Sequence, residues 1–195
     1  LEIYGVTSRP QDTPELNLTT FEEAKQMDLI IPSVPISAFE STIKKLADGI
    51  NPEAVVIDVC SVKVNPVKWM QQYLPESVQI CGTHPLWGPD SVRINGGLKG
   101  LPMIVCPIRL SSTMQSLIMA LVERTEMSGF VMTPEQHDQK MAWSLLYFQL
   151  IGRIGNGAGV KDTGINTVGF SKLLDLQENY AMNDSWQLFE DMYKY

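Results

Sequence analysis

The chain has few positive charges and no cluster of them. Fifteen Lys and Arg residues stand against 22 Asp and Glu residues, which gives a net charge of −7 over 195 residues. Binding to nucleic acid or to an anionic membrane surface needs a basic patch, so we expect neither partner. Apolar runs are also short, and the longest, from Leu29 to Ile36, is interrupted by two prolines. We therefore expect a soluble chain that does not cross a membrane.

Cysteine is scarce as well. The three cysteines, Cys60, Cys81 and Cys106, lie in apolar runs and have neither paired nor metal-ligand spacing. This pattern is typical of reduced core residues, and it predicts no metal site. It favours a reducing compartment, either the cytoplasm or, if a transit peptide has been removed, the plastid stroma.

What the sequence does contain is an alternation of short apolar strands and amphipathic helices. Helices are expected over residues 21–27, 36–46 and 66–73, between strands at 1–6, 28–31, 55–60, 78–81 and 101–106. Such alternation predicts an α/β fold with a parallel sheet, whose strand ends meet at one edge. From Ser111 onward only helical spacing recurs, so we place a boundary near Pro107. The helical half has many apolar residues at helical spacing, more than we expect it to bury alone, and this favours dimerisation.

Two polar clusters follow neighbouring strands of this predicted sheet. Ser61 and Lys63 come after the strand at 55–60, and His84 comes after the strand at 78–81. Ligands bind at the carboxyl ends of strands in open α/β sheets. Pro85 restrains the backbone of His84, so this imidazole is a candidate general base. The alternative is a histidine that only hydrogen-bonds a loop carbonyl.

The other histidine favours a plainer interpretation. His137 and Asp138 follow the capping residue Thr133 in the first turn of a long helix, where a solvated helix start is the favoured hypothesis. Ser8 and Arg9 at the end of the first strand would suit a ribose 2′-phosphate. That hypothesis requires a glycine-rich loop before them. No G-x-G-x-x-G occurs, and the chain starts in mid-pattern, so we expect that residues precede Leu1.

Four segments resemble the prephenate/arogenate dehydrogenase family of tyrosine biosynthesis. They are D-V-C-S-V-K (58–63), T-H-P-L-W-G-P-D-S (83–91), E-Q-H-D (135–138) and E-N-Y-A-M-N-D-S-W-Q-L-F (178–189). The segments G-L-P-M-I-V (100–105) and I-G-R (151–153) resemble the plant-like arogenate branch of the family more. The resemblance implies a Rossmann-type domain over residues 1–107, with its first strand and glycine-rich loop missing, and an all-helical dimerisation domain over residues 108–195.

The resemblance also implies a reaction and a homodimer. Prephenate or arogenate would lose carbon dioxide while a hydride passes to NADP, or to NAD. His84 would accept the hydrogen bond of the substrate hydroxyl, Ser61 would bridge to it and Lys63 would hold the loop. Cofactor-binding positions would be Ser8, Arg9, Ser33, Val34, Pro35 and Ser61, and substrate-binding positions would be Asp90, His137, Gln149 and Arg153.

Two departures from the family pattern keep an alternative open. Gln149 stands where many bacterial members have a second histidine, and N-T-V-G-F (166–170) lacks the arginine that grips the substrate carboxylate. Arg153 or Lys172 would have to replace it. The alternative is therefore a catalytically silent homologue that acts as a dimeric aromatic-ligand-binding protein. A 3-hydroxyacid-type dehydrogenase is less favoured, because that class would require a lysine base in the helical half.

Overall fold

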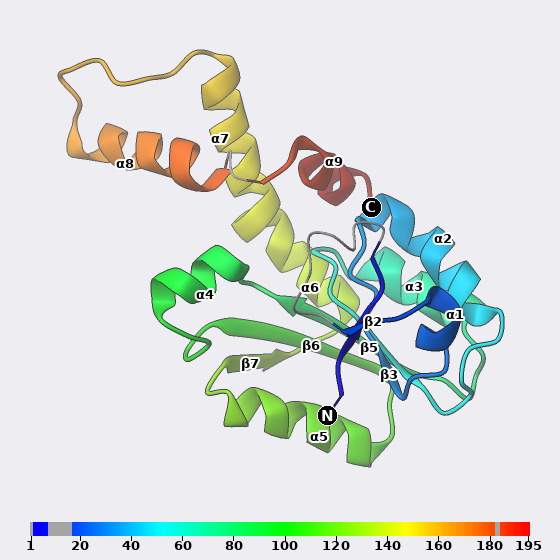
Figure 1. The fold of residues 1–195 in the computed structure, drawn as a ribbon. Helices are drawn as coiled ribbons and strands as arrows, with labels where there is room; N and C mark the ends of the chain where they lie inside the picture. Colours follow the sequence, from blue (N-terminus) through cyan, green and yellow to red (C-terminus); the bar gives the residue numbers. More distant parts are fainter. Residues whose placement is uncertain (1, 8–16, 182–183) are drawn as a thin grey trace.

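The computed structural model describes residues 2–7, 17–181 and 184–195, and a five-stranded sheet forms its centre (Figure 1). The strand order is β3-β4-β5-β6-β7. The strands are β3 (Leu29–Ile30), β4 (Val55–Asp58), β5 (Gln79–Pro85), β6 (Pro102–Arg109) and β7 (Ser128–Val131). Strands β3, β4 and β5 are parallel, whereas β6 runs antiparallel to β5 and β7 runs parallel to β6. The predicted common edge of strand ends therefore holds for the first three strands only.

Successive side chains of the central strands enter two different cores. Val56 and Ile80 pack into the larger core with helices α2 (Ile36–Ala47) and α3 (Val64–Tyr73). The next residue of β5, Cys81, enters a smaller core with Ile118 and Val122 of α5 (Ser112–Arg124). Strand side chains alternate between faces, so this division places α2 and α3 on one face of the sheet and α5 on the other (Figure 1).

Local capping explains where several helices begin. Thr20 forms the predicted cap of α1 (Phe21–Ala24), in a capping box with Glu23. Ser111 caps α5 and Thr133 caps α6 (Pro134–Met141) in the same way, through side-chain oxygens that accept backbone N–H groups. The short strands β1 (Tyr4–Gly5) and β2 (Asn17–Leu18) form a separate parallel pair.

One long helical path carries the chain away from the sheet. Helix α6 continues through the π-helical turn η2 (Ala142–Leu146) into α7 (Tyr147–Gly157). The chain returns through α8 (Val168–Leu176), the π-helical turn η3 (Gln177–Ala181) and α9 (Trp186–Lys194) (Figure 1). Gly152 permits close packing of α7 against η3, since a Cβ there would overlap Ala181. Among the residues described, no helix has both the length and the apolarity that crossing a membrane requires.

Helix α4 (Pro89–Asn95) follows β5 and ends at Gly96, which has the left-handed conformation (φ 74°). One expectation about the segment after α5 was wrong. Residues 128–131, where no strand was expected, form β7. All four are exposed and show no alternation of burial, so this strand forms through its pairing with β6. Strand β6 also runs through Pro107. We propose that the sheet domain extends to β7 and that the helical domain starts near α6.

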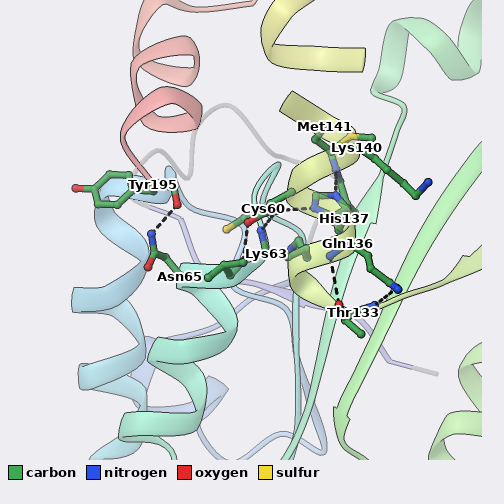
Figure 2. Close-up of polar contacts among 12 residues, drawn as sticks. Cys60, Lys63, Asn65, Thr133, Gln136, His137, Lys140, Met141 and Tyr195 are labelled. Atoms are coloured by element: carbon green, nitrogen blue, oxygen red, sulfur yellow. Dashed lines mark hydrogen bonds and ion pairs between the residues drawn. The ribbon is translucent and has the colours of Figure 1, made fainter. Parts of the chain in front are cut away.

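Helix α9 contacts the starts of both α2 and α3. The buried Asp191 accepts the backbone N–H of Ser37 in the first turn of α2, at 3.0 Å, and takes the place of a side-chain cap there. The Asn65 side chain donates to the Tyr195 carbonyl at 2.5 Å (Figure 2). These contacts hold the end of the helical path against the carboxyl edge of β3 and β4.

Candidate active site

A buried ion pair supports the loop that follows β4. Asp58 ends the strand, Lys63 is the N-cap residue of α3, and neither side chain has any solvent exposure. The Lys63 ammonium pairs with Asp58 Oδ1, which also accepts the Cys60 N–H at 2.8 Å. The Thr83 hydroxyl of β5 donates to the Asp58 carbonyl at 2.7 Å. Burial raises the pKa of Asp58, and the nearby Lys63 opposes that shift. These bonds therefore hold the loop that contains Ser61 in place.

His84 lies within β5, not in a turn after it. The strand was predicted to stop at Cys81 but continues to Pro85, because β6 pairs with it along that length. The ring is only 5% exposed, and its Nδ1 is 2.9 Å from Nε2 of His137. Burial above all, with Lys63 and His137 nearby, lowers the pKa of His84 to about 3. The imidazole is therefore neutral at ordinary pH.

His137 and Asp138 link this imidazole to the start of α3. His137 is fully buried, and its Nδ1 is 2.7 Å from Asp138 Oδ1. The Asp138 carboxylate accepts the backbone N–H groups of Lys63 (2.7 Å) and Val64 (2.9 Å). Figure 2 shows His137 pointing from α6 toward the Cys60 and Lys63 loop. The favoured hypothesis of a solvated helix start was wrong here.

A small cavity opens beside this cluster. It measures about 110 Å³ and has Ser61 and Asp138 as its polar lining residues. Its other walls come from the Ser61 loop, the α6–η2 helix and α9, through Val62, Met141, Ala142, Leu145, Leu146, Met192 and Tyr195. Ser61 is half-buried here, and no hydrogen bond joins it to His84 in the part of the chain that the structure describes. Ser61 thus lies in the loop after β4 and His84 in the neighbouring strand β5, without a hydrogen bond between them among the described residues.

The predicted cofactor positions divide into two groups. Ser33, Val34 and Pro35 form the turn from β3 into α2, at the carboxyl end of a parallel strand. Ser33 is exposed, and its hydroxyl makes only a 3.5 Å contact with a carbonyl two residues earlier. These residues fit the edge of a nucleotide site. Ser8 and Arg9 lie outside the described residues.

The predicted substrate positions are not all brought together. Asp90 is exposed on α4 and pairs with Arg93 at 2.8 Å. Gln149 is buried and donates to the carboxylate of Asp184, while Arg153 donates to the Asp184 carbonyl at 2.8 Å. Gln149 and Arg153 therefore meet around Asp184 in the helical part. In the described residues, neither contacts His84.

Sequence reasoning underrated the acidic residues of the site. Asp58 entered the sequence analysis only within the motif at 58–63, and Asp138 was interpreted as part of a solvated helix start. The role of Asp58 depends on Lys63 at the start of the next element, and that of Asp138 depends on the first turn of α3, about 75 positions earlier in the chain. The one local signal was a His-Asp pair directly after the cap Thr133, a position that polar surface residues also occupy.

Acid should destabilise the protein through His84. An unfolded histidine has a pKa of about 6.5, whereas the pKa of His84 in the folded chain is about 3. Between those values the unfolded state binds a proton that the folded state does not, so stability present above pH 6.5 is lost as pH falls toward 3. When the pH falls from 6.5 to 5, the free energy of unfolding of the wild type should fall by about 2 kcal/mol more than that of His84→Asn. Urea denaturation at both pH values measures this, and equal losses would contradict it.

The fold defines a class before it defines a family: an α/β nucleotide-binding domain followed by a helical segment. The family model "Prephenate dehydrogenase, nucleotide-binding domain" matches residues 15–127. The chain belongs to the prephenate/arogenate dehydrogenase family, which confirms the resemblance seen in its motifs and the fold class. A second model, "TYRAAT1-like, C-terminal domain", matches residues 155–195.

Individual relatives agree with this assignment. Arogenate dehydrogenase 1, chloroplastic, of Arabidopsis thaliana is 32% identical over 176 residues, covering 86% of this chain and 27% of the relative. A probable arogenate/prephenate dehydrogenase of Methanocaldococcus jannaschii is 26% identical over 155 residues, covering 78% of this chain and 33% of the relative. The chain thus spans about a quarter to a third of the length of these two relatives.

Solved structures show the same fold. The crystal structure of Synechocystis arogenate dehydrogenase superposes with a TM-score of 0.73 at 20% identity, covering 100% of this chain and 75% of that one. Prephenate dehydrogenase from Aquifex aeolicus, in complex with hydroxyphenyl propionate and NAD+, gives 0.75 at 19% identity, with 98% and 72% coverage.

Proposed function

We propose that the protein carrying this chain oxidises and decarboxylates arogenate or prephenate. The observation that carries the proposal is a neutral, buried His84 whose Nδ1 is engaged by His137. Its Nε2 is the ring nitrogen that none of the described residues engages, so it remains to accept a proton from a ligand. A general base must be unprotonated and within hydrogen-bond reach of the proton that it takes, and a neutral imidazole with one ring nitrogen open meets the first of these conditions.

The chemistry asks little more of the protein than a base and alignment. The C4 hydroxyl of the ring gives its proton to His84 as the C4 hydride leaves, and nicotinamide, when bound, takes that hydride with its electron pair. Breaking the bond to the C1 carboxylate releases carbon dioxide, and its electron pair completes the aromatic ring. His84 then returns the proton to the phenolate oxygen. Ser61, which lines the adjacent cavity, supplies a second hydroxyl contact to the substrate oxygen in this proposal.

The cofactor would lie along the β3–α2 turn. Ser33, Val34 and Pro35 line this position in the proposal, and Ser33 has an exposed hydroxyl to offer. Ser8 and Arg9 support NADP over NAD, because Arg pairs bidentately with a phosphate. Asp90, Gln149 and Arg153 are kept as candidate substrate contacts. The neutral Gln149 in a position where many relatives have histidine supports a shift of substrate preference within the family.

Dimerisation through the helical path is also part of the proposal. Helices α6–α7 carry an exposed apolar stripe of Trp143, Tyr147, Leu150 and Ile154, at 73%, 50%, 41% and 61% exposure. Their spacing places them along one side of the helix. A second copy covering this stripe would remove apolar surface from water. The three buried free cysteines support a reducing compartment, the cytoplasm or the plastid stroma.

Side-by-side kinetics test this function. The full-length protein is assayed for reduced NADP and reduced NAD with arogenate and with prephenate. We expect turnover with arogenate and NADP to give the highest kcat/KM, because the plant-like motifs and Arg9 point that way. If reduced cofactor forms with neither substrate, the proposal fails and the silent ligand-binding homologue takes its place.

A further inference from the structure

A chain of hydrogen bonds joins His84 to the first turn of α3. His84 on β5 contacts His137 on α6 at 2.9 Å, and His137 contacts Asp138 at 2.7 Å. Asp138 in turn accepts the backbone N–H groups of Lys63 and Val64. We call His84, His137 and Asp138 the relay. It unites three elements that are separated in the sequence, and both imidazoles are buried.

The charge at one end of the relay sets the direction of every bond in it. Both oxygens of Asp138 accept N–H groups at the start of α3, where the helix dipole favours a negative charge. An ionised carboxylate can only accept hydrogen bonds. His137 must therefore carry its proton on Nδ1. In the neutral ring, this leaves Nε2 of His137 as an acceptor facing His84.

The same reasoning fixes His84. Its Nδ1 faces the acceptor Nε2 of His137, so Nδ1 carries the proton and Nε2 has the bare lone pair. We propose that His137 and Asp138 are positioning residues that hold His84 in the tautomer whose Nε2 accepts the substrate proton. This inference rests on the proposed function for the identity of the proton donor. It moves His137 from the substrate-binding group to a place behind the base.

The relay also bears on the charge that forms during the reaction. A protonated His84 would be a buried cation near the Lys63 ammonium, and both burial and that ammonium disfavour it. The Asp138 carboxylate, one ring further along, is the negative group that offsets this. Nδ1 of His84 keeps its proton and its bond to His137 in both states, so accepting a proton on Nε2 needs no rearrangement.

Asp138→Ala tests the end of the relay. Both His137 Nδ1 and the Lys63 N–H lie at hydrogen-bond distance from Asp138 Oδ1, so the amide nitrogen of an asparagine could not take that place without facing the Lys63 donor. Alanine removes the acceptor instead, so the tautomers of His137 and His84 are no longer fixed and the charge that offsets a protonated His84 is lost. We expect a fall of at least about a hundredfold in kcat with little change in KM, the scale of a disabled general base. His137→Leu should act similarly, whereas His137→Gln, whose amide oxygen can still accept from His84, should retain more of the rate.

The tautomer is read directly from the ¹⁵N chemical shifts of His84 in the full-length protein. We expect a protonated Nδ1 and a bare Nε2 in the wild type, and a mixture of the two tautomers in Asp138→Ala. Thr133→Ala is the matched control, because it removes the side-chain cap of the same helix without changing any residue of the relay. It should keep both the tautomer and kcat.

The outcomes separate the relay from the function. A protonated Nε2 in the wild type, or an unchanged tautomer in Asp138→Ala, overturns the relay even if the enzyme turns over normally. Equal losses of kcat in Asp138→Ala and Thr133→Ala would also overturn it, since they would reduce Asp138 to a structural cap. If neither substrate reacts, the proposed function fails, and the ¹⁵N measurement still decides the tautomer.

Discussion

His84→Asn is expected to lower kcat by about a hundredfold or more, the usual scale for a lost general base. Asparagine places an amide near the position of Nδ1, so the contact with His137 Nε2 can be kept. It supplies nothing at the position of Nε2. The variant therefore removes the proton acceptor while leaving the packing of β5 close to the wild type. Steady-state kinetics with the preferred substrate and cofactor measure the effect.

The division between kcat and KM makes this result informative. A group that acts only in the transition state changes kcat and kcat/KM together, whereas lost ground-state binding raises KM alone. We expect the first pattern for His84→Asn. Thr83→Ser on the same strand is the control, because it keeps the hydroxyl that donates to the Asp58 carbonyl. Near-normal turnover of His84→Asn would remove His84 from the role of base.

Much of the fold follows from local sequence patterns. The helix over residues 36–46 was predicted because Ile36, Phe39, Ile43 and Leu46 recur at helical spacing, and all four are buried in α2. The run from Val55 was predicted as a strand and forms β4, an interior strand between β3 and β5. Periodicity succeeds in these segments because one face or both faces of each element enter a core.

Other features depend on contacts that no local pattern records. Strand β7 has four exposed residues and forms through its pairing with β6, so its sequence shows no alternation. His84 was singled out from the sequence as a candidate base, but its place inside β5 depends on the antiparallel partner β6. The relay is a further case, since the spatial neighbours of Asp138 lie about 75 positions earlier in the chain.

Lys63→Met is expected to lower the free energy of unfolding by about 3–5 kcal/mol, because it leaves a buried carboxylate without its partner. Asp58 has no exposure, and its Oδ2 already lacks a hydrogen-bond partner in the described structure. The ammonium also opposes protonation of His84. The same variant should therefore raise the pKa of His84, which NMR titration of the ring measures.

Two further variants make this result specific to the buried pair. Lys63→Met combined with Asp58→Asn removes both charges, keeps an oxygen for the Cys60 N–H, and should recover a large part of the lost stability. Lys99→Met breaks the exposed Lys99–Glu126 pair, at 77% and 61% exposure, and should lower stability by about 1 kcal/mol or less. If Lys63→Met and Lys99→Met were equally mild in urea denaturation, the Asp58–Lys63 pair would not support the Ser61 loop. The position of Ser61 beside the base would then depend on the Asp138 bonds to the start of α3 alone.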